Sequence, residues 1–353
     1  MANDSEFIAQ LDPQTQTDEA VSLFDLNVAD DKLVRMLVNE LDEDISFWNQ
    51  KPWLLKETDE QNIKYYLGDQ LDTSQFLPHQ APYIDNRLFT SIRAILAYVT
   101  GQLAKPSVLP SKTDDKYQRI ARQMEEILYQ HARDHDVNEF LKLAVKNLLS
   151  RKRGVLKLRF DEYYGPFGDI CTENLDPSDI VVARHTIYGT DPERVYLRQK
   201  GSIEKLIAKF PDKEKQILEF FRIIRGTHKQ MSRVVTYWEC WFSYWDETKK
   251  QGLAWFLPNA DWLLGKMENP NWIYLPDKEA ERIVNMTFEP VKPFIWLNYV
   301  NTGRSYIDET CLVDQAMPLQ DILNKRGRQI VENADYANPR VMIDKRVMNE
   351  SDA

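Results

Sequence analysis

The chain has 353 residues, of which 43% are hydrophobic and 11% aromatic, and its formal net charge is −10. This balance is that of a folded protein with room for two or three domains, and it excludes a disordered or fibrous chain. The acidity gathers at the N-terminus, where residues 1–60 hold fifteen acidic and four basic side chains. Because phosphate repels such a surface, the charge disfavours a general DNA-binding protein, although solubility alone would also account for it.

The cysteines and the apolar segments indicate a reducing, non-membrane setting. Cys171, Cys240 and Cys311 lie far apart and form no C-x-x-C pair, so we expect reduced thiols and no zinc site. The acidic N-terminus has no apolar core of a signal peptide. No apolar stretch approaches the roughly 20 residues that span a bilayer.

The first 150 residues have a helical pattern. We expect a flexible acidic arm over residues 1–29, followed by amphipathic helices in which apolar residues recur every three or four positions. These helices are predicted over 30–45, 85–103, 113–132 and 137–148, the last with a capping-box-like start at Asp136 and Glu139.

From Gly154 onward the pattern becomes that of β-strands with intervening helices. Strands are predicted over 154–160, 170–175, 180–183, 195–198, 234–245, 253–257, 272–275 and 294–299. Helices are expected over 202–210 and 212–224, and a polar turn over 246–252. A long helix over 308–337, interrupted at Met317 and Pro318, precedes a strand over 341–343. Since that last strand has no following partner, we expect the chain to be a fragment of a mixed α+β protein.

Several local patterns occur in an order that is similar to one known family. Arg153–Leu158 follows the helices, residues 174–180 combine a strand with a P-x-D turn, and residues 196–206 join a strand to a Ser-capped helix. Residues 293–299 then precede Gly303-Arg304-Ser305 and the long helix, in which Gln320 and Asn324 form a Q-x-x-x-N pattern. In this order, over residues 35–345, the chain resembles the portal proteins of tailed bacteriophages.

The resemblance implies a portal-like α+β fold. It implies a wing over residues 30–200, a first stem helix region over 201–233, a β-rich clip over 234–298 and a second stem helix region over 299–337. Residues 338–353 would begin the return into the wing, and the C-terminal wing and crown would be missing.

The same resemblance implies a structural role without catalysis. About twelve copies would form a ring at one capsid vertex, through which double-stranded DNA is packaged and ejected. The partners would be the terminase large subunit, a head–tail adaptor and the major capsid protein or scaffold, in the virion and in the host cytoplasm during assembly. No catalytic residue, cofactor, metal or membrane contact is expected.

Three sets of residues are candidates for contacts. Lys325, Arg326 and Arg328 could face DNA phosphates from the long helix, or could form an ordinary solvated face. A basic patch is formed by Arg151, Lys152 and Arg153. It could contact DNA or an acidic neighbour, or its cations could interact with the negative end of the dipole at a helix C-terminus. The remaining set comprises aromatic residues of the clip that could lie in subunit interfaces: Trp238, Trp241, Trp245 and Trp255.

Other functions have weaker patterns. A Mg²⁺-dependent nuclease would use Glu239, Asp246, Glu247 and Lys249, but the last three lie in a predicted polar turn. A different phage connector or adaptor is a further alternative. His131 and His135 have the i, i+4 spacing of zinc ligands, yet no H-E-x-x-H motif is present, and we expect polar surface residues.

Overall fold

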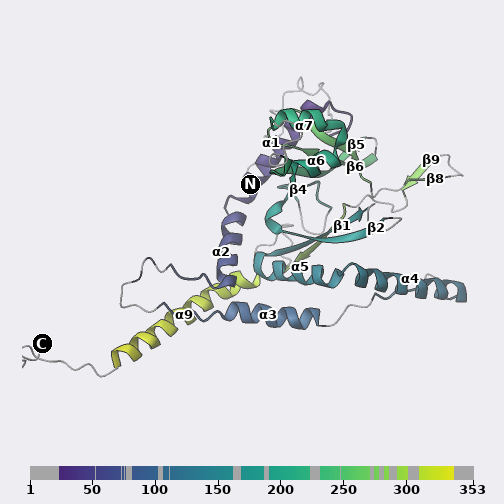
Figure 1. Cartoon of the computed structure of the whole chain (residues 1–353). Helices are drawn as coiled ribbons and strands as arrows, with labels where there is room; N and C mark the ends of the chain where they lie inside the picture. Colours follow the sequence, from purple (N-terminus) through teal and green to yellow (C-terminus); the bar gives the residue numbers. More distant parts are fainter. Residues whose placement is uncertain are drawn as a thin grey trace, which may run out of the picture. The chain divides into compact units, whose positions relative to one another are not determined.

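The chain forms two compact units, each assembled from segments far apart in sequence (Figure 1). The computed structural model describes residues 24–51, 53–72, 74, 76, 82–101, 106–110, 112–161, 168–186, 191–222, 231–246, 248–270, 274–277, 282–285, 292–300 and 310–337. The first unit takes the described parts of residues 1–45, 181–183 and 191–292. The second unit takes those of residues 46–180, 184–190 and 293–353.

The first unit is built on a five-stranded sheet with the order β3-β4-β5-β6-β7. Its strands are β3 (Ile180–Val182), β4 (Arg194–Ser202), β5 (Val234–Asp246), β6 (Thr248–Phe256) and β7 (Leu263–Glu268). The helices are α1 (Asp30–Trp48), α6 (Ile203–Lys209) and α7 (Glu214–Phe220), with a 3₁₀ turn at Pro211–Lys213. A separate antiparallel hairpin pairs β8 (Tyr274–Asp277) with β9 (Arg282–Asn285).

The alternation of side chains along β5 divides this unit into two hydrophobic layers. Trp238, Cys240 and Phe242 pack with apolar residues of α1 on one face of the sheet. Val235 and Tyr237 point to the other face and pack with α6 and α7. Helices therefore cover both faces of the same long strand, which explains why both faces of β5 carry apolar residues.

The second unit packs helices against a three-stranded antiparallel sheet with the order β10-β1-β2. Its strands are β1 (Arg153–Asp161), β2 (Asp169–Leu175) and β10 (Phe294–Asn298), with a 3₁₀ turn at Pro177–Asp179. Its helices are α2 (Leu55–Leu67), α3 (Arg87–Thr100), α4 (Asp115–Asp134), α5 (Val137–Arg151) and α9 (Leu312–Ala337). Residues of α3, α5, β10 and the start of α9 share one hydrophobic cluster.

The α+β class is confirmed, and most predicted elements are present. The predicted turn over 246–252 is wrong, because residues 248–252 already pair in register with β5. The predicted break at Pro318 is also wrong, since α9 runs through it. Asp136 precedes α5 without a side-chain capping bond, in a left-handed conformation (φ 50°), so the predicted capping box is absent.

The compact units cut across the ranges that the family resemblance implies. The wing range 30–200 is divided between both units, and the clip range 234–298 joins the first unit except for β10. The described part of residues 201–233 contains α6 and α7, of seven residues each, rather than one long helix. Phe24, within the expected flexible arm, is buried in the core of the first unit. Residues 338–353 lie outside the described part of the chain.

The Gln320–Asn324 pair fastens α9 to the loop before α3. The Gln320 side chain donates a hydrogen bond to the Asp85 carbonyl (2.6 Å), and its oxygen accepts one from the Arg87 amide (3.2 Å). Asn324 accepts a hydrogen bond from the Asp85 amide (3.2 Å) and donates one to the side chain of Gln70 (2.6 Å). The side chains of Gln320 and Asn324 are both buried. They therefore satisfy backbone groups of the loop that would otherwise be left without hydrogen bonds.

Gly327 extends the same docked face by one turn. A Cβ at this position would lie 2.0 Å from the Tyr83 ring, so only glycine lets that ring lie against the helix. The guanidinium of Arg328 stacks over Phe76, 5.0 Å from the ring centre.

In the described ranges, no helix is both long and apolar enough to cross a bilayer.

Replacing Asn324 with alanine is expected to loosen this docking. The Asn324→Ala variant leaves the Asp85 amide and the Gln70 carbonyl without their partner, which costs about 2 kcal/mol in the free energy of unfolding. Lys325→Ala is the matched control, because the neighbouring side chain is exposed, and we expect a change within about 0.5 kcal/mol. Denaturant unfolding measures both, and equal losses in the two variants would contradict this role.

Candidate functional site

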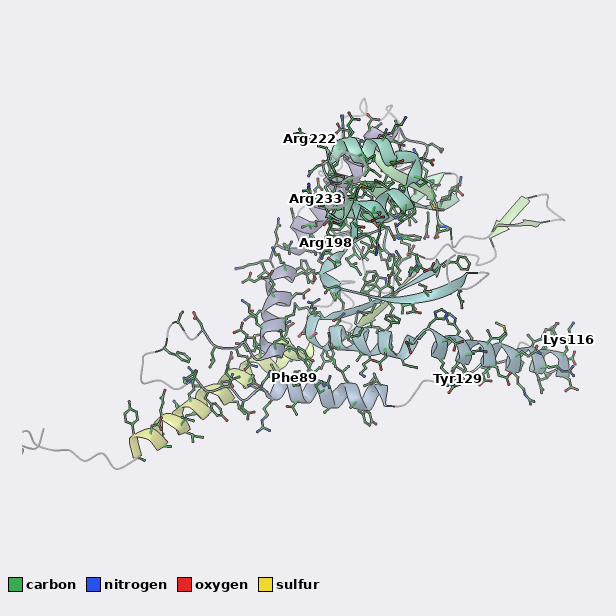
Figure 2. The ribbon with its side chains drawn as sticks, viewed as in Figure 1. Phe89, Lys116, Tyr129, Arg198, Arg222 and Arg233 are labelled. Atoms are coloured by element: carbon green, nitrogen blue, oxygen red, sulfur yellow. The ribbon has the colours of Figure 1, made fainter. Side chains whose placement is uncertain are left out.

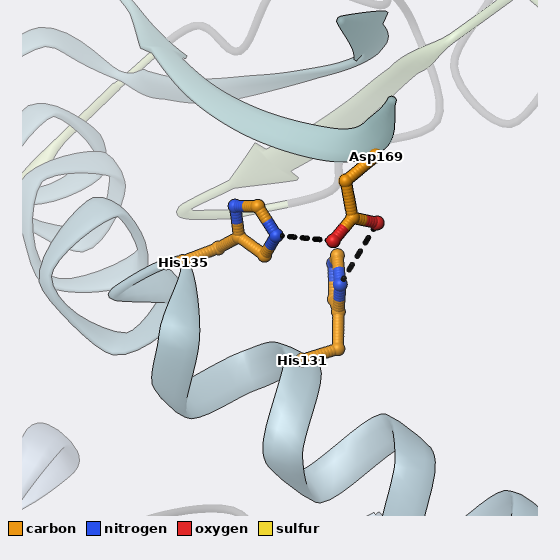
Figure 3. Close-up of side chains that lie close together, drawn as sticks. All are labelled: His131, His135 and Asp169. Carbon is orange, nitrogen blue, oxygen red and sulfur yellow. Dashed lines mark hydrogen bonds and ion pairs between the residues drawn. The ribbon is translucent and has the colours of Figure 1, made fainter. Parts of the chain in front are cut away.

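His131, His135 and Asp169 come together in the second unit (Figure 3). Nε2 of His135 lies 2.9 Å from one oxygen of Asp169, and Nδ1 of His131 lies 3.7 Å from the other. The two imidazole rings are 4.4 Å apart between centres. One carboxylate therefore faces a ring nitrogen of each histidine.

Local structure explains how these side chains meet. His131 lies in the last turn of α4, and His135 follows that helix by one residue, so both project from one side of the helix. Asp169 is the first residue of β2, whose side-chain alternation also puts Cys171 on the same face. The histidine spacing is visible in the sequence, whereas Asp169 is brought in only by the packing of β2 on the α4–α5 junction.

Burial differs across the three side chains. The side chain of His135 is 5% exposed, that of His131 25% and that of Asp169 44%. The prediction that both histidines are polar surface residues is therefore wrong for His135, which is inside the unit and bonded to Asp169. The hydrogen bond from His135 lowers the pKa of Asp169, so this carboxyl is ionised at neutral pH.

Two of the three residues in the predicted basic patch are interior. Lys152 and Arg153 are buried, and Arg151 pairs with Asp176 at the edge of the sheet. Lys152 lies 3.6 Å from Asp314. The patch is therefore not an exposed surface, because these cations bind acidic groups within their own unit.

Arg153 and Asp59 form the most deeply buried ion pair described in this unit. Their charged groups are 4.0 Å apart, and Arg153 also donates a hydrogen bond to the Pro177 carbonyl (2.6 Å). One nitrogen of Arg153 and one oxygen of Asp59 have no hydrogen-bond partner among the described residues. Burial raises the pKa of Asp59 even though Arg153 opposes that shift, so desolvation outweighs the attraction of the pair.

The basic residues of α9 have different surroundings. Lys325 and Arg326 are exposed, and Arg326 donates a hydrogen bond to the neighbouring Gln329 (2.9 Å). Arg328 is half-buried against Phe76. Lys325 and Arg326 thus remain available for an anionic partner, whereas Arg328 belongs to the docked face.

The aromatic residues of the predicted clip are mainly core residues. Trp238 and Trp241 are buried, and Trp255 is partly buried against Phe210. The side chain of Trp245 lies outside the described residues. The prediction that these tryptophans form an interface is therefore wrong for Trp238 and Trp241, because the sheet faces that carry them are covered by helices.

Glu239 of the alternative nuclease site is part of that core. Its carboxylate accepts hydrogen bonds from the indole nitrogens of Trp241 (2.6 Å) and Trp255 (3.2 Å). Trp255 is its register partner on β6, and Trp241 follows two residues later on the same face. The buried carboxylate is satisfied by two indoles, and the side chains of Asp246, Glu247 and Lys249 lie outside the described part.

Comparison with known proteins adds no relative. No protein-family model matches the chain, and no curated protein sequence matches it.

The Asp59–Arg153 pair is expected to show strong energetic coupling. Either Asp59→Leu or Arg153→Met alone leaves the other buried charge without its partner, which costs about 3 kcal/mol or more in the free energy of unfolding. The double variant removes both charges and should lose less than either single variant. Arg159→Met is the control from the same strand, since its pair with Asp161 is exposed and contributes about 0.5 kcal/mol or less. Denaturant unfolding of the four proteins measures the coupling, and simple additivity of the two single losses would contradict it.

Proposed function

We propose that the chain is a portal-like structural subunit whose copies assemble side by side into a ring that conducts DNA. The observation that carries this proposal is an apolar stripe exposed along α9. The order of sequence motifs supplies the family to which such a ring would belong.

The α9 helix presents three faces. Val313, Gln320 and Asn324 are buried on the first face, the last two toward the loop before α3. About a third of a turn away, large apolar side chains are exposed at i, i+3, i+4 and i+11 positions. They are Leu319, Ile322, Leu323 and Ile330. Lys325 and Glu332 lie on the third face, whereas Arg326 lies within the apolar stripe, one turn from both Ile322 and Ile330.

A similar stripe runs along α4. Only Ala121 of this 20-residue helix is buried, although its sequence is strongly amphipathic. Its exposed apolar residues are Ile120, Met124, Ile127, Leu128 and Tyr129. The neighbouring α3 also exposes large side chains, and Figure 2 labels Phe89 on α3 and Tyr129 on α4.

Copies of the same chain are the occupants that this proposal assigns to the stripes. Exposed apolar rows of this length mark protein–protein contacts. Two different stripes on one unit favour a head-to-tail contact that closes into a ring, rather than a self-complementary dimer. The ring would contain about twelve copies by resemblance to the family.

The charge of the chain is compatible with a DNA conduit. A net charge of −10 limits the attraction of phosphate, so DNA could slide past without strong retention. Lys325, on the charged face, would supply a weak contact if α9 borders the channel. Terminase, a head–tail adaptor and capsid or scaffold protein would bind the outer surfaces in the virion or during assembly. The proposal depends on α9 as the stem helix and does not depend on residues 201–233.

Oligomer formation tests the role of the stripe. Unmodified chain is expected to form rings in negative-stain micrographs and a matching large species in mass photometry. Leu319→Glu combined with Ile330→Glu should weaken each subunit contact by about 3 kcal/mol, because two large apolar side chains no longer become buried. Thermal unfolding of the monomer should change little, since both residues are exposed.

Lys325→Glu is the matched control, an added acidic residue on the charged face of the same helix, and it should retain the rings. A parent chain that stays monomeric at micromolar concentration would contradict the proposal. Equal assembly of the stripe variant and the control would show that the stripe is not the contact.

The absence of enzymatic activity is part of the proposal and has its own test. Supercoiled plasmid incubated with the chain and Mg²⁺ should remain intact, because the Glu239 carboxylate is bonded to two indoles. Cleavage that disappears in Glu247→Ala would instead support the nuclease alternative.

A further inference from the structure

The His131–His135–Asp169 cluster has the donor set of a transition-metal site. Each side chain offers one ligand atom, two nitrogens and one oxygen, and these atoms all lie within 4.8 Å of one another. Among the described residues, no lysine or arginine pairs with the Asp169 carboxylate, whose contacts are the two imidazoles and the amide of Ile170. No lysine or arginine of the described part therefore occupies the position at which a metal ion would bind to the Asp169 carboxylate.

The distances are close to those that a bound ion requires. A tetrahedral Zn²⁺ with ligands at about 2.0–2.2 Å holds its ligand atoms about 3.4 Å apart. The nitrogen–oxygen separations of 2.9 and 3.7 Å run to different oxygens of Asp169, whereas the set that shares one oxygen has all its ligand atoms within 4.8 Å. Small side-chain rotations would bring the widest separation, at most 4.8 Å, into range.

We propose that His131, His135 and Asp169 bind one divalent transition-metal ion of the Zn²⁺ class. Imidazole nitrogens favour Zn²⁺, Co²⁺ or Ni²⁺ over Mg²⁺ and Ca²⁺, which take oxygen ligands. Three protein ligands leave a fourth position for water or another ligand. Metal binding here does not depend on ring formation, although the histidines and the exposed apolar stripe lie on the same helix, α4.

The surroundings orient two of the three ligands. The Ile170 amide donates a hydrogen bond to one oxygen of Asp169 (2.7 Å) and so fixes the carboxylate. Sγ of Cys171 lies 3.8 Å from Nδ1 of His135, the ring nitrogen turned away from Asp169. With Nε2 on the metal, Nδ1 would carry the proton, and this sulfur, a weak acceptor, would be its hydrogen-bond partner outside the ligand shell.

The bound ion would fasten α4 to the sheet. The histidines come from the C-terminal end of α4, and Asp169 begins β2 (Figure 3). Since α4 buries only Ala121, this cluster is a principal point at which the described helix is fixed to the sheet. Metal binding would therefore set the direction of α4 by stabilising its base.

Titration of the metal-free full chain with ZnCl₂ tests the proposal. We expect calorimetry to show one Zn²⁺ bound per chain, with a rise in the thermal unfolding midpoint that EDTA reverses. MgCl₂ should give neither effect. Co²⁺ provides a second readout, because visible d–d absorption of mixed nitrogen and oxygen ligation reports the ligand set.

His131→Asn and Asp169→Asn are the decisive variants, since both side chains are partly exposed and the variants should fold. Each is expected to weaken Zn²⁺ binding at least tenfold, or by about 1.4 kcal/mol. His185→Asn is the control, because it removes an exposed histidine outside the cluster, and it should bind as the parent does. His135→Asn adds a further test if its circular dichroism spectrum matches that of the parent.

Two results would overturn the site. Zn²⁺ binding that is unchanged in both His131→Asn and Asp169→Asn would place the metal elsewhere in the chain. A parent chain that binds no Zn²⁺ at micromolar concentration would mean that the three side chains form an ion-pair cluster alone.

Discussion

The second unit depends on two consecutive cations that are placed inside it. Lys152 has a left-handed backbone (φ 73°) where α5 ends and β1 begins, and Arg153 is the first residue of the strand. A non-glycine residue in that conformation is strained, and burying either charge carries a further cost. Asp314 at the start of α9 and Asp59 on α2 reduce the cost of burying these charges, and through them one tight turn contacts three helices and a sheet.

The same junction explains why helical periodicity alone missed α2. Its buried residues are Leu55, Asp59 and Asn62, two of which are polar. Asn62 donates hydrogen bonds to Asp314 (2.7 Å) and to the sulfur of Cys311 (3.3 Å). A helix that packs through charges and amides lacks the apolar pattern on which the prediction rests. In contrast, α3 buries Leu88, Ile92 and Leu96, and its sequence predicted it correctly.

The candidate contact residues show a related limit of sequence reasoning. Runs such as Arg151-Lys152-Arg153 suggest a surface patch, because isolated cations are rarely buried. Their acidic partners are up to 162 positions away along the chain, in the case of Asp314, and no local pattern reveals them. The tryptophans of β5 posed the opposite problem, since an aromatic strand is consistent with either an interface or a strand covered on both faces. Because α1 covers one face of this sheet and α6 and α7 cover the other, the buried tryptophans of β5 belong to the core.

One face of α4 links the two proposals physically. His131 and His135 continue the i, i+4, i+7 row that begins with Ile120, Met124 and Ile127. The end of this row nearest α5 meets β2 through Asp169, while the rest of it is exposed. The helix is therefore held at its base and presents apolar side chains beyond the sheet. Docking an exposed helix onto a partner loses less conformational entropy when the direction of the helix is already fixed. Fixing the base of α4 would therefore favour association with a neighbouring copy.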